Sequence, residues 1–264
     1  MRRLLSFACG KAELAASLDG ETGATGLLMV TGGSQTRIGS HRMYERLSKA
    51  LAKNNIPCFR FDRRGVGDSE GEDPGFRDSG ADIAAAVTAF RAKVPGLERM
   101  IGFGLCDGAS ALALHGKAAG LDGFILVNPW LVEAEAGSPP PVAIRRHYLQ
   151  RLLTREGWRK IVTGAVDYRK LLTGVKKMSA RDKDSPLGQE VAAALRASGL
   201  RSWLILCAND ATAVAAEAEL KRPAFKGLIE GRETIPSDSH TFARPGDEAA
   251  LLTATLRALK ALGG

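Results

Sequence analysis

The segment M-I-G-F-G-L-C-D-G-A-S-A-L, residues 100–112, is the most informative part of this chain. Its apolar first half predicts a buried strand and its small-residue second half a helix, with Gly104-Leu105-Cys106-Asp107-Gly108 at the junction. A residue at a sharp strand-to-helix turn has strained backbone, and its neighbours two positions away must lack a side chain for the turn to close. Such a turn exposes the Cys106 thiol at a helix N-terminus, where the helix dipole favours a thiolate. The backbone amide of Asp107 would then point to where an oxyanion forms.

The G-x-C-x-G pattern alone has a second interpretation. Glycine-rich turns are common, and most cysteines in them are inert, so other parts of the chain must distinguish a nucleophile from a structural thiol.

The composition is that of an ordinary globular protein. With 264 residues, 45% hydrophobic and 25% charged, the chain can form one large α/β domain or a core with an insertion. The four cysteines are far apart and show no C-x-x-C spacing, which argues against a zinc site and against a disulfide framework. The first apolar run is too short for a signal peptide, and no run approaches the length of a membrane span. We therefore expect a soluble, cytoplasmic protein with reduced thiols.

Apolar runs alternate with segments of helical periodicity along most of the chain. The expected strands are 26–31, 57–62, 100–105, 123–128, 202–207 and 227–234, and the expected helices are 44–54, 79–92, 108–119 and 247–262. Two short runs, 4–8 and 13–18, predict an N-terminal hairpin. This alternation is typical of a mostly parallel sheet with helices on both faces.

The interval between Asn128 and Ser202 breaks the alternation. It is polar and basic, with helical runs at 144–153 and 190–197. We expect residues 131–200 to form a helical lid inserted into a core made of residues 1–130 and 201–264.

Residues 144–184 carry twelve Lys and Arg against four acids, so this segment accounts for the whole net charge of +8. It is either a solvated helical face or a surface that attracts an anionic substrate, an anionic membrane or an acidic partner. Aromatic residues are few and no nucleic-acid module is present, so we expect no nucleic-acid binding.

A cysteine nucleophile needs a base, and His240 is the candidate that the chain order favours. It lies in a polar loop after the last expected strand, although a lone loop histidine is often only a surface residue. His115 falls within a helix and His147 within the basic segment, so both are expected to be structural or surface residues. His41 follows the glycine loop near the start of a helix and could line the site.

The base in turn needs an orienting acid, and Asp210 follows the strand 202–207, where such an acid would lie. The alternative role for Asp210 is the N-cap of the next helix. Asp238 is a second candidate, although it is only two residues from His240, which makes the geometry awkward.

The order nucleophile, acid, histidine resembles that of the α/β-hydrolases, with cysteine in place of the usual serine. Gly32-Gly33-Ser34 after the first core strand matches the family's second oxyanion position, which implies the amide of Gly33 or Ser34 as a donor. The segment F-D-R-R-G-V-G-D-S at 61–69 looks like the family's D-x-R-G-x-G-x-S turn, which is scaffold.

A narrower resemblance covers nearly the whole chain. The segments that carry it are G-G-S-Q-T-R-I-G-S-H-R at 32–42, G-L-C-D-G-A-S at 104–110, N-P-W at 128–130, Y-L-Q-R-L at 148–152 and S-H-T-F at 239–242. Together they resemble exosortase A system-associated hydrolase 1. This resemblance implies a bacterial protein linked to exopolysaccharide production and protein sorting, with hydrolase activity.

These features predict acyl transfer, by an esterase or thioesterase, through a Cys106–His240–Asp210 triad. An S-acyl intermediate can pass to water or to another acceptor, so hydrolase and acyltransferase both remain open. A third possibility is a non-catalytic hydrolase fold whose basic segment binds a partner or a membrane. No ligand cluster appears, so we expect neither metal nor cofactor. We expect the Asp107 carboxylate to point away from the thiol, because an inward carboxylate would oppose a thiolate.

Overall fold

The computed structural model describes residues 2–133 and 185–263. The strands are β1 (Arg2–Cys9), β2 (Ala12–Asp19), β3 (Thr25–Val30), β4 (Cys58–Phe61), β5 (Arg99–Leu105), β6 (Gly123–Val127), β7 (Arg201–Cys207) and β8 (Gly231–Ile235). The α-helices are α1 (Met43–Ala52), α2 (Gly80–Lys93), α3 (Asp107–Ala119), α7 (Pro186–Ser198), α8 (Ala211–Leu220) and α9 (Asp247–Gly263). Short 3-10 helices are η1 (Ser40–Arg42), η2 (Phe76–Asp78) and η3 (Pro223–Phe225).

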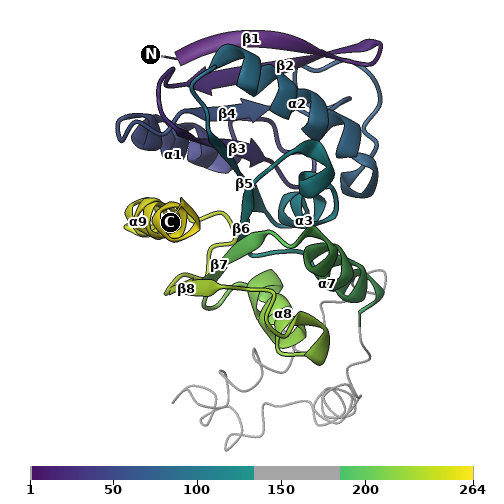
Figure 1. The fold of residues 1–264 in the computed structure, drawn as a ribbon. Coiled ribbons are helices and arrows are strands. Elements are labelled where there is room, and N and C mark those ends of the chain that lie inside the picture. Colours follow the sequence, from purple (N-terminus) through teal and green to yellow (C-terminus); the bar gives the residue numbers. More distant parts are fainter. Residues whose placement is uncertain (1, 134–184, 264) are drawn as a thin grey trace, which may run out of the picture.

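The described strands form one eight-stranded sheet in the order β1-β2-β4-β3-β5-β6-β7-β8. The hairpin β1–β2 is antiparallel and joins β4 in antiparallel register, whereas β4, β3, β5, β6, β7 and β8 run parallel. Helices α1 and α9 cover one face of the sheet, and α2, α3 and α7 cover the other (Figure 1). This three-layer arrangement follows from strands that are apolar on both faces.

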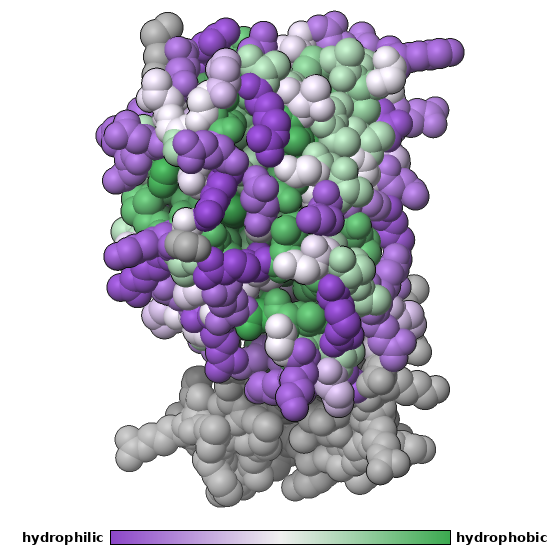
Figure 2. Space-filling model, viewed as in Figure 1, coloured by the Kyte–Doolittle hydropathy of each residue, from purple (hydrophilic) through white to green (hydrophobic). Residues whose placement is uncertain are grey.

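The core lies between the sheet and its two helix layers. In β3, residues Leu27 to Val30 are completely buried, and the whole of β6 is buried as well. Hydrophilic side chains are spread widely over the face of the molecule in Figure 2. No described helix is long and apolar enough to cross a membrane.

Most expected elements are present, with one clear difference at the last strand. The N-terminal hairpin and the runs 26–31, 57–62, 100–105, 123–128 and 202–207 are strands within one or two residues of the expected bounds. The strand expected at 227–234 begins only at Gly231. Gly227 has a φ of +75° and Leu228 donates to the carbonyl of Phe225, so this part is a turn.

Part of the expected insertion lies in the described part of the chain and part outside it. Helix α7, within the range 131–200, connects to β7 and packs against α3, with Ser185 accepting from the Gly188 amide as its N-cap. The expected helix at 144–153, His147 and the basic segment 144–184 lie outside the described residues. The division into core and lid stays a prediction.

The sheet brings the candidate residues to one edge. Cys106 follows the carboxyl end of β5, Asp210 follows β7, His240 follows β8, and Gly33 follows β3. Because the carboxyl ends of parallel strands meet at the same edge, four segments that are distant in sequence lie together there.

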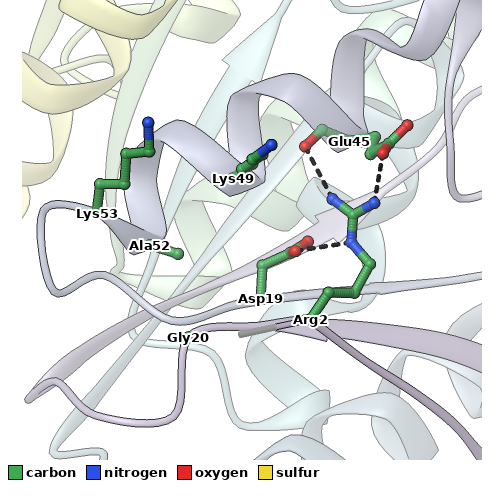
Figure 3. A pocket seen from close by; sticks show the side chains of 7 residues that line it. All are labelled: Arg2, Asp19, Gly20, Glu45, Lys49, Ala52 and Lys53. Carbon is green, nitrogen blue, oxygen red and sulfur yellow. Dashed lines mark hydrogen bonds and ion pairs between the residues drawn. The ribbon is translucent and has the colours of Figure 1, made fainter.

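A cavity of about 390 Å³ lies at the opposite end of the sheet (Figure 3). Asp19, one of its lining residues, pairs in register with Cys58, the first residue of β4. The Asp19 carboxylate accepts from Arg2, Ser48 and the buried guanidinium of Arg60 at 2.6–2.8 Å. At this end of the molecule, ion pairs and hydrogen bonds of Asp19 connect the N-terminal hairpin with β4 and α1.

Candidate active site

Cys106 occupies a strained turn between β5 and α3. Its φ of 60° and ψ of −127° lie outside the regions that side-chain-bearing residues normally adopt. Its amide donates to the carbonyl of Val127, which fixes the turn against β6. Of the four cysteines, Cys106 alone is not buried, and all four are free thiols. The turn therefore presents one accessible thiol at the start of a helix.

The two glycines of G-x-C-x-G are required by the packing of this turn. A Cβ on Gly104 would lie 2.6 Å from the backbone of Gly108, and a Cβ on Gly108 would lie 2.6 Å from the carbonyl oxygen of Val30. Both approaches are closer than any side chain tolerates. The steric reason expected from the sequence is present in the fold.

The imidazole of His240 contacts the carboxylate of Asp210. The distance from Nδ1 of His240 to Oδ2 of Asp210 is 3.0 Å. The same carboxylate oxygen accepts from the amide of Ala213 at 2.9 Å, so Asp210 is also the N-cap of α8. The two roles weighed for Asp210 are therefore compatible, and the cap fixes the carboxylate for the histidine.

Burial lowers the pKa of His240, and this is the largest single effect on the ring. The hydrogen bond and charge of Asp210, together with the nearby Cys106 side chain, outweigh burial and raise the pKa of His240 to about 10. The ring is therefore an imidazolium at neutral pH. A cation near Cys106 would favour the thiolate form that a cysteine nucleophile needs.

The loop after β3 lies directly against the turn at Cys106. A Cβ on Gly32 would lie 2.5 Å from the carboxylate of Asp107 and 3.2 Å from Cβ of Cys106. The amide of Gly33 donates to Oδ1 of Asp107 at 2.6 Å. The carboxylate therefore points toward the β3 loop, and the expectation that it points away from the thiol stays a prediction. The N-terminal turn of α3 carries the carboxylate toward the β3 loop, where an amide donor satisfies it.

The turn after β4 supports this loop, as expected for scaffold. Asp62 accepts from both the backbone amide and the guanidinium of Arg37. Arg63, which is buried, donates from Nη2 to the carbonyl oxygen of Gly33 at 2.6 Å. The bond from Arg63 fixes the peptide group between Gly33 and Ser34. The amide of Gly33 or of Ser34 as the oxyanion donor stays a prediction.

Asn128 is a further residue of this site. It is completely buried at the end of β6, with a φ of 40°. Its Nδ2 donates to the carbonyl oxygen of His240 at 3.2 Å, and its Oδ1 accepts from the amide of Cys207 at 2.8 Å. The sequence marks Asn128 as the end of an apolar strand and as part of the N-P-W segment, and neither feature gave it a role in the site. A polar residue at the carboxyl end of a buried parallel strand is the signal that could have identified it.

The other candidates have different partners. His115 contacts the carbonyl oxygen of Arg77 through Nε2, and His41 contacts that of Thr241 in the same way. The carboxylate of Asp238 pairs with Arg244 at the surface, away from the imidazole. Asp210 is therefore the acid that meets His240. In the described ranges, no group of His, Cys, Asp and Glu side chains could hold a metal ion.

The match to a family model covers residues 27–251, and its description is "Alpha/beta hydrolase family". The chain belongs to this family. Its fold is the α/β-hydrolase fold, a mostly parallel eight-stranded sheet between helices.

Solved structures with the same fold include several esterases. An esterase from Pyrococcus furiosus is 14% identical, with a TM-score of 0.68 over 100% of this chain and 92% of the esterase. Est1E from Butyrivibrio proteoclasticus, determined with ferulic acid bound, is 17% identical, with a TM-score of 0.63 and 98% coverage of both chains. A dienelactone hydrolase from Anabaena variabilis is 14% identical, with a TM-score of 0.63 over 99% of this chain and 98% of the hydrolase. No curated protein matches this α/β-hydrolase in sequence.

Proposed function

We propose that this α/β-hydrolase hydrolyses ester or thioester substrates through an S-acyl intermediate on Cys106. The observation that carries the proposal is the 3.0 Å contact between Asp210 and His240, with Cys106 in a strained strand-to-helix turn and near enough to the imidazole to raise its pKa. The esterases that share the fold support the same reaction class.

The proposed reaction has two steps. The Cys106 thiolate attacks the acyl carbon, and the leaving group departs with the proton of the His240 imidazolium. Neutral His240 then takes a proton from water, which attacks the S-acyl group and releases the carboxylic acid and the thiolate. The amide of Asp107, with that of Gly33 or Ser34, would stabilise the oxyanion in both steps. Asp210 orients the imidazole and stabilises its charge.

The same intermediate also serves an acyltransferase, in which an acceptor other than water takes the acyl group.

On its sequence motifs, we propose that the enzyme acts beside an exosortase and exopolysaccharide system. The free thiols of the described cysteines fit a reducing cytoplasm. We also propose that the basic segment 144–184 attracts an anionic substrate, an anionic membrane or an acidic partner.

The test is the formation of an acyl-enzyme. The protein is incubated with acetyl and longer-chain thioesters and with p-nitrophenyl esters, and intact mass and product release are followed. We expect an acyl adduct on Cys106 that is absent in Cys106→Ala and retained in the control Cys9→Ala, a buried thiol outside the site. The absence of both adduct and turnover across both substrate classes would contradict the proposal and leave a binding role for the fold.

A further inference from the structure

The side chain of His41 joins the segment after β3 to the loop that carries His240. Nε2 of His41 lies 2.7 Å from the carbonyl oxygen of Thr241, the residue that follows His240. A carbonyl oxygen only accepts hydrogen bonds, so Nε2 carries a proton and donates it. The neutral and the charged imidazole can both keep this N–H, so the hydrogen bond does not depend on the charge of His41.

The backbone of this segment directs the His41 ring into the contact. His41 and Arg42 have φ angles of 41° and 66°, in the left-handed region that side-chain-bearing residues seldom adopt. Gly39 precedes them with a φ of 76°, and the amide of Ser40 donates to Oε1 of Gln35 at 3.2 Å, which braces the turn. Strained backbone of this kind persists only where the surrounding structure enforces it, and it is concentrated at functional sites.

His41 holds the His240 loop from a direction that its other anchors do not cover. Asp210 contacts the ring of His240, and Asn128 donates to the carbonyl oxygen of His240 at 3.2 Å. These two residues follow β7 and end β6, whereas His41 follows β3, on the other side of Cys106 in the order of the strands. The contact therefore ties the loop of the expected oxyanion donors to the loop of the base, across the nucleophile.

We propose that His41 is a positioning residue for His240. It holds the peptide that follows the imidazole against the segment after β3, so that the ring keeps its place between Asp210 and Cys106. A small displacement of a catalytic group lowers the rate of the chemical step, because the reacting atoms are no longer aligned. His41 acts through His240 and takes no part in the chemical steps. This inference rests on the proposed function of Cys106.

Three variants separate the donor of His41 from its ring. His41→Phe keeps an aromatic ring but removes the donor, and His41→Gln keeps an N–H donor near the end of the side chain. His115→Phe is the matched control, since Nε2 of His115 contacts the carbonyl oxygen of Arg77 at 2.8 Å, between α3 and η2. The rate of acyl-enzyme formation, kcat and KM are measured with p-nitrophenyl acetate and with an acetyl thioester. Urea unfolding is followed in every protein.

We expect His41→Phe to lower kcat by about 2- to 10-fold, the range of one hydrogen bond, with KM and the urea midpoint unchanged. We expect His41→Gln to keep most of the wild-type kcat, and His115→Phe to match the wild type.

A kcat of His41→Phe equal to that of the wild type would overturn the inference. Equal losses in the Phe and Gln variants would also overturn it, because the donor would then not matter, and a urea midpoint that falls together with kcat would make the role of His41 structural. If the wild type itself forms no acyl-enzyme with either substrate, the proposed function of Cys106 fails, and the inference with it.

Discussion

At the residue scale, the position of the thiol depends on glycines that surround it. Cys106 holds a backbone conformation that costs of order 1–3 kcal/mol in isolation, so its neighbours must enforce it. Gly108 does so by letting α3 approach the carbonyl of Val30. The strain is therefore a property of the packed turn.

Replacing Gly108 with Ala should disturb this turn. The new Cβ would overlap a backbone carbonyl that cannot move freely, so we expect a loss of about 1–3 kcal/mol in the free energy of unfolding and at least a tenfold loss of acyl transfer. Urea unfolding and acyl-enzyme kinetics measure both. Gly96→Ala is the control, because no atom lies within 4 Å of a Cβ there. Equal stability and activity in the two variants would contradict the steric account.

The protonation of His240 depends on Asp210. In Asp210→Asn the carboxylate charge and its hydrogen bond are lost, so the pKa of His240 should fall from about 10 toward or below its ordinary 6.5. Titration of the imidazole resonances by NMR measures this shift. In the wild type, the folded state holds this proton more tightly than the unfolded chain, so His240 stabilises the protein fully below pH 6.5. That contribution is lost as the pH rises toward 10. An unchanged pKa in the variant would contradict the assigned role of Asp210.

At the scale of elements, Asn128 ties three segments together. Its side chain joins the end of β6 to the end of β7 and to the loop that carries His240. A fully buried carboxamide with several hydrogen bonds fixes the relative positions of these segments.

We expect Asn128→Ala to lower the free energy of unfolding by about 1–3 kcal/mol, because the amide of Cys207 and the carbonyl of His240 lose their partner. Because the loop that carries His240 is then less fixed, kcat should fall by a larger factor than KM rises. The dependence of kcat on pH, which reports the protonation of His240, should become broader. Asn54→Ala is the control, since Asn54 is exposed in the turn after α1 and its side chain donates to the carbonyl of Ala50. Loss of stability with an unchanged kcat and pH profile would limit Asn128 to a structural role.

Most strands and helices could be predicted from the sequence, because each depends on a local pattern of apolar residues. The order of Cys106, Asp210 and His240 along the chain could be read from the sequence in the same way. The apolar runs around Gly26 and Gly123 are long enough to identify buried strands, and the glycines around Cys106 identify the turn. The direction of the Asp107 carboxylate could not be predicted, since it depends on the loop after β3, 74 residues away. Asn128 was missed for the same reason, because its partners lie on other segments.

At the scale of the whole molecule, buried ion pairs lie at the end of the sheet opposite the site. Asp19 joins the N-terminal hairpin to α1 and β4 through Arg2, Ser48 and Arg60. Burial raises the pKa of Asp19, but hydrogen bonds from Ser48, Arg2 and Arg60 more than offset it and lower the pKa below its usual 3.8. The stabilisation is therefore present above that value and is lost as the pH falls through the lowered pKa.

Asp19→Ala should lower the free energy of unfolding by about 3–5 kcal/mol, because the guanidinium of Arg60 would stay buried without its counter-ion. Urea unfolding at pH 7 measures this cost, and the difference from wild type should shrink at strongly acidic pH. Glu21→Ala is the control, since its pair with Arg3 is about half exposed on both sides and should contribute under about 1 kcal/mol. Similar losses in the free energy of unfolding for the two variants would contradict the stabilising role assigned to Asp19.

The most direct test of the central claim is the rate of Cys106 alkylation by iodoacetamide as a function of pH, in the wild type and in His240→Ala. Peptide mass analysis separates Cys106 from the three buried cysteines. We predict alkylation that is already fast near pH 6 and is slowed by the substitution, because the imidazolium stabilises the thiolate. A thiol that reacts only at alkaline pH, at the same rate in both proteins, would contradict an activated Cys106–His240 pair.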